Sequence, residues 1–347
     1  MSSARCTRCV LSSSFPGLTF DGEGVCSFCR GELMLTSEES AVEHARRQVE
    51  QLFAVRTRPY DAVLCNSGGK DSSYTLKLAV EKYGLRVLSF TLDNGFISPK
   101  AFENIRCVVD ALGVDHLTVR PSMQILRRIF KAAALLPIYR DKTLTRISAG
   151  CNACISIVNT TGLRLALEKS APFILAGFTL GQIPANAIVY RNNFRFLAES
   201  REESLGRLRA AVGREVDEYY GIGDSLLDRA GPSPHNVNLL CLERVTDEEI
   251  VQAVQVLGWQ RPKDVDGCSS NCQLNTFNNH VHQRRFGYSP YELELSHLIR
   301  KGLMSREEAL EKIADQPLEQ LAAIASRLEL SPPERVALWI PPGRPPA

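Results

Sequence analysis

Apolar runs alternate with amphipathic stretches through much of the chain. The runs with the length and composition of strands lie at 61–64, 86–93, 115–120 and 173–179. Stretches with helical periodicity lie at 37–53, 74–80, 99–113, 122–136 and 155–169. Because strands that alternate with helices form a parallel sheet covered on both faces, the pattern predicts a doubly wound α/β fold.

The second half of the chain is richer in helix patterns. Residues 193–230 are charged and helical, residues 236–245 return to strand character, and a capped helix is expected from Thr246 to Trp259. The stretch from 273 to 340 reads as helices, with a second capping box at Ser305. We therefore expect an α/β domain followed by a helical C-terminal region.

Composition narrows the class of protein without naming a partner. The chain has 347 residues, 44% of them hydrophobic, and a formal charge of +2. This charge gives no global argument for nucleic-acid binding, although a local basic face stays open. No run approaches the ~18 apolar residues of a membrane span, and the polar start lacks the core of a signal peptide. We expect a cytoplasmic protein without a membrane partner.

A glycine loop follows the first predicted strand. It reads Cys65-Asn66-Ser67-Gly68-Gly69-Lys70-Asp71-Ser72-Ser73 and leads into the helix pattern. Two glycines leave successive backbone N–H groups unobstructed, and hydroxyl groups stand at the positive end of the helix. The loop is therefore a candidate site for a phosphate-sized anion, although it lacks the spacing of the common nucleotide P-loop.

Eleven cysteines provide the second chemical signal. Two C-x-x-C pairs near the N-terminus, Cys6/Cys9 and Cys26/Cys29, predict a closed tetrahedral zinc ribbon with a structural role. The alternative is four buried cysteines without a metal. A further pair, Cys151 and Cys154, stands at a helix start, where the helix dipole is expected to lower the thiol pKa. That pair alone is ambiguous among zinc, disulfide and cluster.

The loop sequence Ser67-Gly68-Gly69-Lys70-Asp71-Ser72 closely resembles the PP-loop of the ATP pyrophosphatases, whose fold is HUP-like. The resemblance implies that the loop, through Ser73, holds the phosphates of ATP with Mg²⁺ while an acceptor oxygen attacks the α-phosphate and pyrophosphate leaves. Lys70 and Asp71 are the expected catalytic residues of the loop. Further expected nucleotide contacts are Thr91, Asp93 and Gly177, with a plain turn role equally open for Asp93.

Two branches of this superfamily compete. In the branch that thiolates tRNA, a C-x-x-C pair joins a third cysteine, which implies a [4Fe-4S] cluster on Cys151, Cys154 and Cys268, with Cys272 as a spare ligand. A redox pair at Cys151 and Cys154 is an alternative, as is a second zinc site on Cys268, Cys272, His280 and His282. The N-acetyl sugar amidotransferases are the other branch, which the segments 6–26, 286–288, 299–302 and 306–309 resemble.

The first hypothesis is an adenylate-forming sulfurtransferase acting on an RNA base or a small metabolite with the help of a sulfur donor. The second is an ammonia-dependent sugar amidotransferase with a glutaminase partner. One departure from the family pattern affects both hypotheses. Many thiolases have Gly-His and a nearby acidic pair after this strand, but this chain keeps only the glycine, Gly177, which is followed by Phe178-Thr179-Leu180-Gly181-Gln182. A non-enzymatic ribbon module with an inactive loop is a third hypothesis, and a homodimer stays open.

The resemblance also suggests where the domains lie. We expect a zinc ribbon, a linker helix, a PP-loop ATP-binding domain, a helical insertion, the end of the catalytic domain with Cys268 and Cys272, and a helical C-terminal region. Their predicted bounds are 1–32, 33–56, 57–192, 193–235, 236–285 and 286–347.

Overall fold

A six-stranded sheet forms the centre of the computed structural model, which describes residues 4–31, 36–56, 59–229, 231–314 and 318–340. The strand order is β3-β2-β1-β4-β6-β5. Its strands are β1 (Ala62–Cys65), β2 (Val87–Leu92), β3 (Asp115–Val119), β4 (Phe173–Ala176), β5 (Val189–Arg191) and β6 (His235–Asn238). Only β5 runs antiparallel to its neighbour, so the predicted doubly wound α/β fold is confirmed.

The strand order places the carboxyl end of β1 at the switch point of the sheet. β1 pairs with β2 on one side and with β4 on the other, so the direction of strand addition reverses at β1. In open parallel sheets, ligands bind outside the carboxyl ends of the strands at such a switch point. The glycine loop begins there, directly after Cys65.

Helices cover both faces of the sheet because neighbouring strand residues point in opposite directions. Leu64 packs in one cluster with residues of α1 (Thr36–Phe53) and α3 (Pro99–Leu112). Val63 packs on the other face with Leu163 of α6 (Ala149–Glu168). The helix after the glycine loop, α2 (Lys70–Lys77), continues as a π-helical turn (Leu78–Lys82).

The remaining helices follow the predicted order. Those up to β6 are α4 (Met123–Leu135), α5 (Asp141–Leu144), α7 (Phe194–Val212), α8 (Asp217–Tyr220) and α9 (Asp224–Arg229). Those after β6 are α10 (Asp247–Gln255), α11 (Leu274–Phe286), α12 (Glu292–Arg300), α13 (Arg306–Lys312), α14 (Leu318–Arg327) and α15 (Pro332–Ala337). Both predicted capping boxes, at Thr246 and Ser305, are present.

Several details differ from the sequence expectation. The helix expected from Thr246 to Trp259 ends at Gln255. The strand expected at 236–245 ends at Asn238, and Leu239–Leu242 form a buried 3₁₀ turn. A short apolar run has the same composition in a strand and in a buried helical turn, so periodicity could not separate them. The edge strand β5 was not predicted, because a segment of this length carries little alternation.

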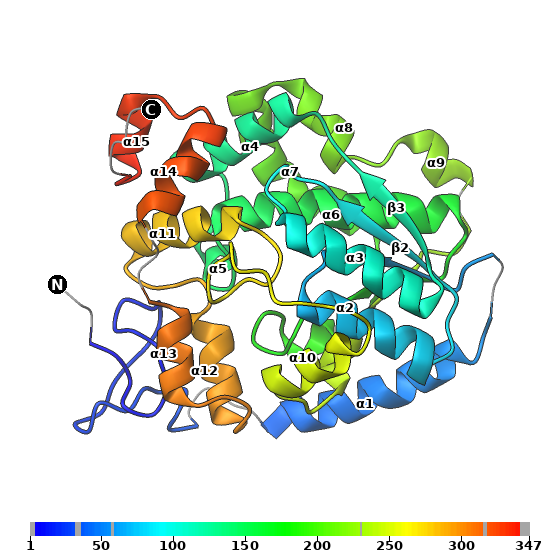
Figure 1. The fold of residues 1–347 in the computed structure, drawn as a ribbon, viewed down its shortest axis with the longest axis horizontal. Coiled ribbons are helices and arrows are strands. Elements are labelled where there is room, and N and C mark those ends of the chain that lie inside the picture. Colours follow the sequence, from blue (N-terminus) through cyan, green and yellow to red (C-terminus); the bar gives the residue numbers. More distant parts are fainter. Residues whose placement is uncertain (1–3, 32–35, 57–58, 230, 315–317, 341–347) are drawn as a thin grey trace.

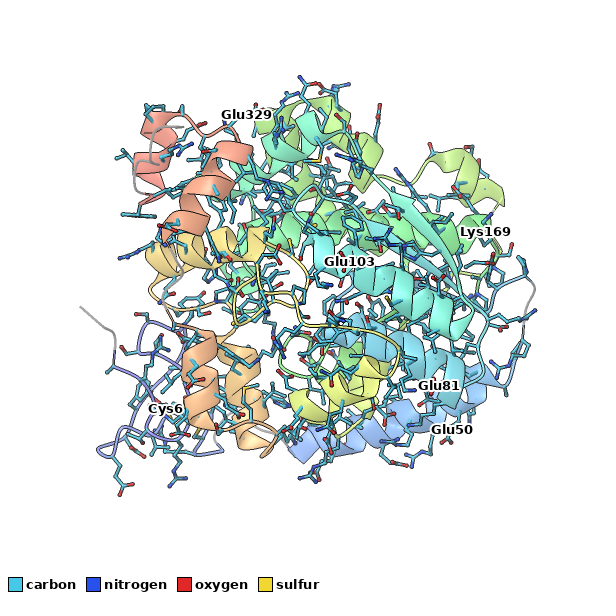
Figure 2. All side chains as sticks on the ribbon, in the orientation of Figure 1. Cys6, Glu50, Glu81, Glu103, Lys169 and Glu329 are labelled. Atoms are coloured by element: carbon cyan, nitrogen blue, oxygen red, sulfur yellow. The ribbon has the colours of Figure 1, made fainter. Side chains whose placement is uncertain are left out.

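The N-terminal segment packs against helices from a distant part of the sequence. Figure 1 shows the N-terminal segment, in blue, beside the orange helices α12 and α13. Phe15 and Tyr288 stack edge to face with ring centroids 5.2 Å apart, and Leu293 of α12 belongs to the same apolar cluster. In Figure 2, Cys6 lies in this N-terminal segment next to these helices. The ribbon segment therefore packs on the C-terminal helices.

Within the described residues, no helix combines the length and the apolar character needed to cross a membrane. Residues 341–347 of the predicted C-terminal region lie outside the described residues. Residues 32–35, where the predicted ribbon meets the predicted linker helix, also lie outside them. The predicted division into domains stays a prediction.

Candidate active site and cysteine sites

The glycine loop is held by close backbone contacts. Gly68 has a φ of 77°, and a Cβ there would lie 2.3 Å from the carbonyl oxygen of Ala101, so only glycine fits. The Gly68 carbonyl accepts a hydrogen bond of 2.9 Å from the indole of Trp259, and the Gly68 N–H donates 3.1 Å to Asn66 Oδ1. The loop is therefore fixed from both sides.

The hydroxyl groups of the loop lie at the start of α2. Ser72 Oγ accepts from the Ser67 N–H at 3.2 Å and lies 3.1 Å from Ser67 Oγ. Gly69 is the N-cap residue and makes no side-chain cap bond. The buried Ser73 Oγ and Asn66 Nδ2 have no partner in the described part of the chain. Donors at a helix start without protein partners fit an anionic ligand.

Lys70 is the cation of the loop and is already paired. Its Nζ lies 2.6 Å from Asp71 Oδ1 and 2.9 Å from Asp247 Oδ1 of α10. Burial alone would lower the pKa of Lys70, but these carboxylates raise it above its ordinary value. The charge is thus held at the loop, but phosphate groups would have to compete with Asp247 for it.

The C-terminal part of the chain forms the opposite wall. Ser270 Oγ accepts from the Lys70 backbone N–H at 3.1 Å, although the two residues are 200 positions apart. A pocket opens between these walls, with Lys70 and Asp71 on one side and Cys268, Tyr291 and Glu294 on the other. The predicted phosphate site is therefore shared by two distant parts of the sequence.

Asp247 links the pocket to α13. Its Oδ2 lies 2.9 Å from Lys312 Nζ, while its other oxygen faces Lys70. Burial would raise the pKa of Asp247, but Lys70 and Lys312 outweigh it and lower the pKa to about 2. A carboxylate between two lysines holds both cations near the loop.

The other predicted nucleotide contacts lie around the same strand ends. The buried Thr91 hydroxyl donates to the Asn66 carbonyl and so holds β2 to the loop. Asp93 accepts 2.9 Å from the Gly95 N–H and pairs with Arg120 at 3.5 Å, which favours its turn role. Gly177 lies close to Asp71 and Thr75, where a Cβ would be 2.8 Å from the Thr75 hydroxyl.

The N-terminal cysteines gather as predicted. The sulfur atoms of Cys6, Cys9, Cys26 and Cys29 all lie within 4.8 Å of one another. Backbone N–H groups of Arg8 and Cys26 donate to Cys6 Sγ at 3.4 and 3.3 Å. Hydrogen bonds from Cys26 and Cys29 lower the pKa of the Cys9 thiol. Four sulfur ligands at this spacing fit one metal ion and leave no open position.

The downstream cysteines form a second group. Asn94 Nδ2 lies 3.5 Å from Cys154 Sγ and 3.6 Å from Cys272 Sγ, so one amide contacts both sulfurs. Cys151 Sγ accepts 3.2 Å from Asn278 Nδ2. Cys272, in the segment before α11, and the Asn278 amide, within α11, therefore both lie near the start of α6.

Gly150 makes this arrangement sterically feasible. A Cβ at Gly150 would lie 2.1 Å from Asn278 Oδ1. Any larger residue would push Asn278 away from Cys151, so the glycine belongs to the cysteine group.

Cys268 points elsewhere. Its sulfur contacts the Lys312 carbonyl at 3.1 Å, and the residue lines the pocket beside the loop. His280 contacts the Trp339 carbonyl at 3.2 Å, and His282 packs on the rings of Phe286 and Tyr288. Among the described residues, the N-terminal four are the one His/Cys/Asp/Glu group that meets the spacing for a single metal ion. The structure thus does not bring Cys268, Cys272, His280 and His282 together.

The expectation of low thiol pKa values at α6 is wrong. Burial raises the pKa of Cys151 to about 11, and it raises those of Cys154 and Cys272 as well. The loss of solvent outweighs the helix dipole and the amide hydrogen bonds. These thiols are neutral near pH 7 when no metal is bound.

Comparison with known proteins points to the C-terminal segment. Residues 262–337 match the family described as "LPS biosynthesis protein WbpG-like, C-terminal domain". We refer to this matched stretch below as the WbpG-like segment. It begins before Cys268 and ends in α15, so it contains Ser270, Cys272 and Glu294. The matched part of the chain is the part that forms the second wall of the pocket.

A relative spans nearly the whole chain. An uncharacterized protein of Methanocaldococcus jannaschii is 22% identical over 314 residues, which cover 89% of this chain and 92% of the relative. The sequence similarity therefore extends over most of the length of both chains.

Solved structures give more distant similarities. The U34-tRNA thiolase NcsA of Methanococcus maripaludis, with its [4Fe-4S] cluster, is 15% identical with a TM-score of 0.36, covering 90% of each chain. NMN synthetase of Francisella tularensis is 12% identical with a TM-score of 0.37, covering 84% of this chain and 97% of that one. The NH3-dependent NAD synthetase of Campylobacter jejuni is 11% identical with a TM-score of 0.35, covering 89% and 97%.

These scores are too low to assign an activity. The PP-loop resemblance predicted from the loop sequence agrees with the position of the loop, which follows β1 at the switch point of the sheet.

Sequence reasoning missed several pocket residues. Asp247 was interpreted only as part of a helix cap, and Glu294 was not singled out at all. Both lie in amphipathic helices, where a carboxylate is ordinary. The loop 177–183 lacks a carboxylate of its own, and this absence was the one available signal that an acid comes from elsewhere.

Proposed function

We propose that this chain is an ATP-dependent, adenylate-forming enzyme that activates an amide oxygen of an N-acetyl sugar and lets ammonia displace AMP. The amide oxygen attacks the α-phosphorus of ATP and pyrophosphate leaves. Ammonia then attacks the activated carbon, and the C–O bond to AMP breaks. The product carries nitrogen where the amide had oxygen.

The observation that carries this proposal is the composition of the pocket. One wall is the PP-loop with Lys70, and the other is the WbpG-like segment with Tyr291 and Glu294. The family description of that segment refers to lipopolysaccharide synthesis, which favours a sugar as the acceptor. The acceptor would enter between the two walls and meet the α-phosphate there.

The loop residues suit the adenylation step. Backbone N–H groups at the start of α2 and the charge of Lys70 would stabilise the negative charge that develops at the α-phosphate. Mg²⁺ would add further charge stabilisation when bound with ATP. No residue of the chain is assigned to it.

The test is the formation of AMP and pyrophosphate from ATP in the presence of Mg²⁺, ammonium chloride and a panel of nucleotide-linked N-acetyl sugars. Mass spectrometry of the sugar product should show NH in place of O. Lys70→Ala should lower the rate by ~10²–10³-fold, as expected for loss of a transition-state donor. Lys77→Ala, on the same helix, is the matched control and should keep the rate. An absence of AMP with every sugar would reject the acceptor class.

A second candidate, sulfur transfer, is favoured by the cysteine group at α6. Cys151, Cys154 and Cys272 lie around the amides of Asn94 and Asn278. Among the described residues, these three sulfur atoms do not meet the spacing required for one metal ion. Sulfurs that bind different irons of a cluster lie farther apart than ligands of one ion, which favours a cluster over a zinc ion here. A [4Fe-4S] cluster on three thiolates would leave one iron open to bind sulfide. In this candidate Cys272 takes the place predicted for Cys268.

Iron, acid-labile sulfide and zinc per chain, measured on anaerobically purified protein, test the second candidate. Cys272→Ala should lose iron and sulfide while retaining zinc, and Cys268→Ala should retain all three. Loss of iron in Cys268→Ala alone would return Cys268 to the cluster. Zinc without iron in the unmodified protein would leave the amidotransferase as the proposal.

A further inference from the structure

A carboxylate from α12 reaches the phosphate side of the pocket. Glu294 lines the pocket together with Lys70 and Asp71, and its Oε1 accepts a hydrogen bond of 3.0 Å from the Thr179 hydroxyl. Thr179 belongs to the loop after β4, which carries no acidic residue from Gly177 to Ile183. The carboxylate at this strand end is thus delivered by the WbpG-like segment.

Within the described residues, none of the pocket cations Lys70, Arg261 and Lys312 forms an ion pair with Glu294. Lys70 pairs with Asp71 and Asp247, and Lys312 pairs with Asp247. Glu294 instead faces like charge from Asp71 across the pocket. Burying a carboxylate without a partner cation is costly, and such groups concentrate at functional sites.

The surroundings tune the acidity of this group. Burial and the charge of Asp71 raise the pKa of Glu294 to about 7, against the opposing effects of Thr179, Lys70 and Gln182. Other titratable or charged residues lining the same pocket are Asp247, Arg261, Cys268, Tyr291 and Lys312. A carboxyl group in this range can both take and release a proton near neutral pH.

We propose that Glu294 is the general base of the amidation step. The lone pair of ammonia forms the new C–N bond, the proton lost by that nitrogen passes to the Glu294 carboxylate, and the electrons of the C–O bond leave with AMP. The protonated carboxyl group then releases its proton to solvent. This inference rests on the proposed function and adds a residue that touches the reacting nitrogen.

The position of α12 explains how the base is held. Glu292 and Ser296, on the same helix, bond the ribbon backbone: Glu292 Oε2 accepts 2.9 Å from the Ser12 N–H, and Ser296 Oγ accepts 3.4 Å from the Val10 N–H. Glu294 points from the same helix toward Thr179. Contacts with both the ribbon and the β4 loop therefore fix the base relative to the PP-loop.

The first experiment is the pH profile of AMP formation in Glu294→Gln, with the total ammonium adjusted at each pH so that the concentration of free NH3 stays constant. The rate of the unmodified protein should rise as pH increases through about 7, because the base must be ionised. Glu294→Gln should lower the rate by ~10²–10⁴-fold and lose this rise. Thr179→Val should keep a measurable rate but shift the rise to higher pH, because it removes a bond that favours the carboxylate. Glu311→Gln, exposed on α13, is the control.

ATP binding, measured by calorimetry without any acceptor, gives an independent readout. Ionised Glu294 should repel the phosphates, so the ATP affinity of the unmodified protein should fall as pH rises through the same range. Glu294→Gln should bind ATP with an affinity that no longer changes there. Equal pH dependence in both proteins would overturn the placement of Glu294.

The outcomes separate the two proposals. If the unmodified protein forms AMP and Glu294→Gln has the same rate and profile, the base is not Glu294 and the proposed function stands. If the unmodified protein binds ATP but forms no AMP with any nucleotide-linked sugar, the proposed function fails, and the role of Glu294 as its base fails with it.

Discussion

In the pocket, the negative charge of Asp247 is shared between two lysines. Lys70, Asp247 and Lys312 form a chain in which one carboxylate contacts two ammonium groups at 2.9 Å each. ATP would bring a large negative charge to the same place. Asp247 is therefore expected both to stabilise the ligand-free protein and to compete with the phosphates for Lys70.

Asp247→Asn should separate these two roles. The free energy of unfolding should fall by about 1–3 kcal/mol, because Lys312 loses its carboxylate partner and Lys70 keeps only Asp71. ATP affinity should rise, because Lys70 becomes more available to phosphate. Urea unfolding and calorimetry measure the two effects, with Glu248→Gln on the same helix as control. A loss of both stability and ATP affinity would mean that Asp247 orients Lys70 for the ligand.

The same residue gives an acid dependence with a defined sign. The pKa of Asp247 is lowered from 3.8 to about 2 in the folded protein. Its contribution to stability is therefore complete above pH about 4 and is lost as the pH falls toward 2. The stability difference between the unmodified protein and Asp247→Asn should shrink over that range.

At the scale of elements, α12 and α13 connect the ribbon to the pocket. The Arg306 guanidinium of α13 donates to the carbonyl oxygens of Cys6 and Cys9 at 3.2 and 3.1 Å. Glu292 of α12 is buried and pairs with Arg5 at 2.7 Å. The ribbon thus holds the helix that carries Glu294.

Glu292→Gln should weaken this connection. It removes a buried charge that faces Arg5 and two backbone N–H groups, so we expect a loss of roughly 1–3 kcal/mol in unfolding free energy. The zinc predicted at the four N-terminal cysteines should be released faster to a chromophoric chelator, and AMP formation should fall with it. Glu307→Gln, exposed on α13, is the control. Unchanged zinc release would indicate that the ribbon does not depend on α12.

Some of these elements could be predicted from sequence and others could not. The core strands and α3 have clear periodicity and caps, and the N-terminal cysteines have a spacing that allows few alternatives. Cys268 and Cys272 lie only four positions apart in a segment without periodicity, so their directions depend on tertiary packing. Asp247 and Glu294 become pocket residues only because α10 and α12 fold against a loop far away in sequence.

At the scale of the whole molecule, the pocket forms only when segments far apart in the sequence pack together. The loop comes from the first half, Asp247 follows the last strand of the sheet, and Ser270 and Glu294 come from the WbpG-like segment. Residues 66–73 could bind a phosphate alone, but the pocket for an acceptor needs the C-terminal helices. This explains why the loop was readable from sequence and the acceptor was not.

The contact of the ribbon with α12 and α13 also constrains how the protein is made. The ribbon is synthesised well before Glu292, Ser296 and Arg306, which hold it. Its docking must wait until α12 and α13 have been translated, since domains otherwise fold in order from the N-terminus. Early metal capture would let the ribbon persist as a small independent unit during this interval. Nascent chains truncated before α12 would then carry a metal-loaded ribbon that has no surface to dock on.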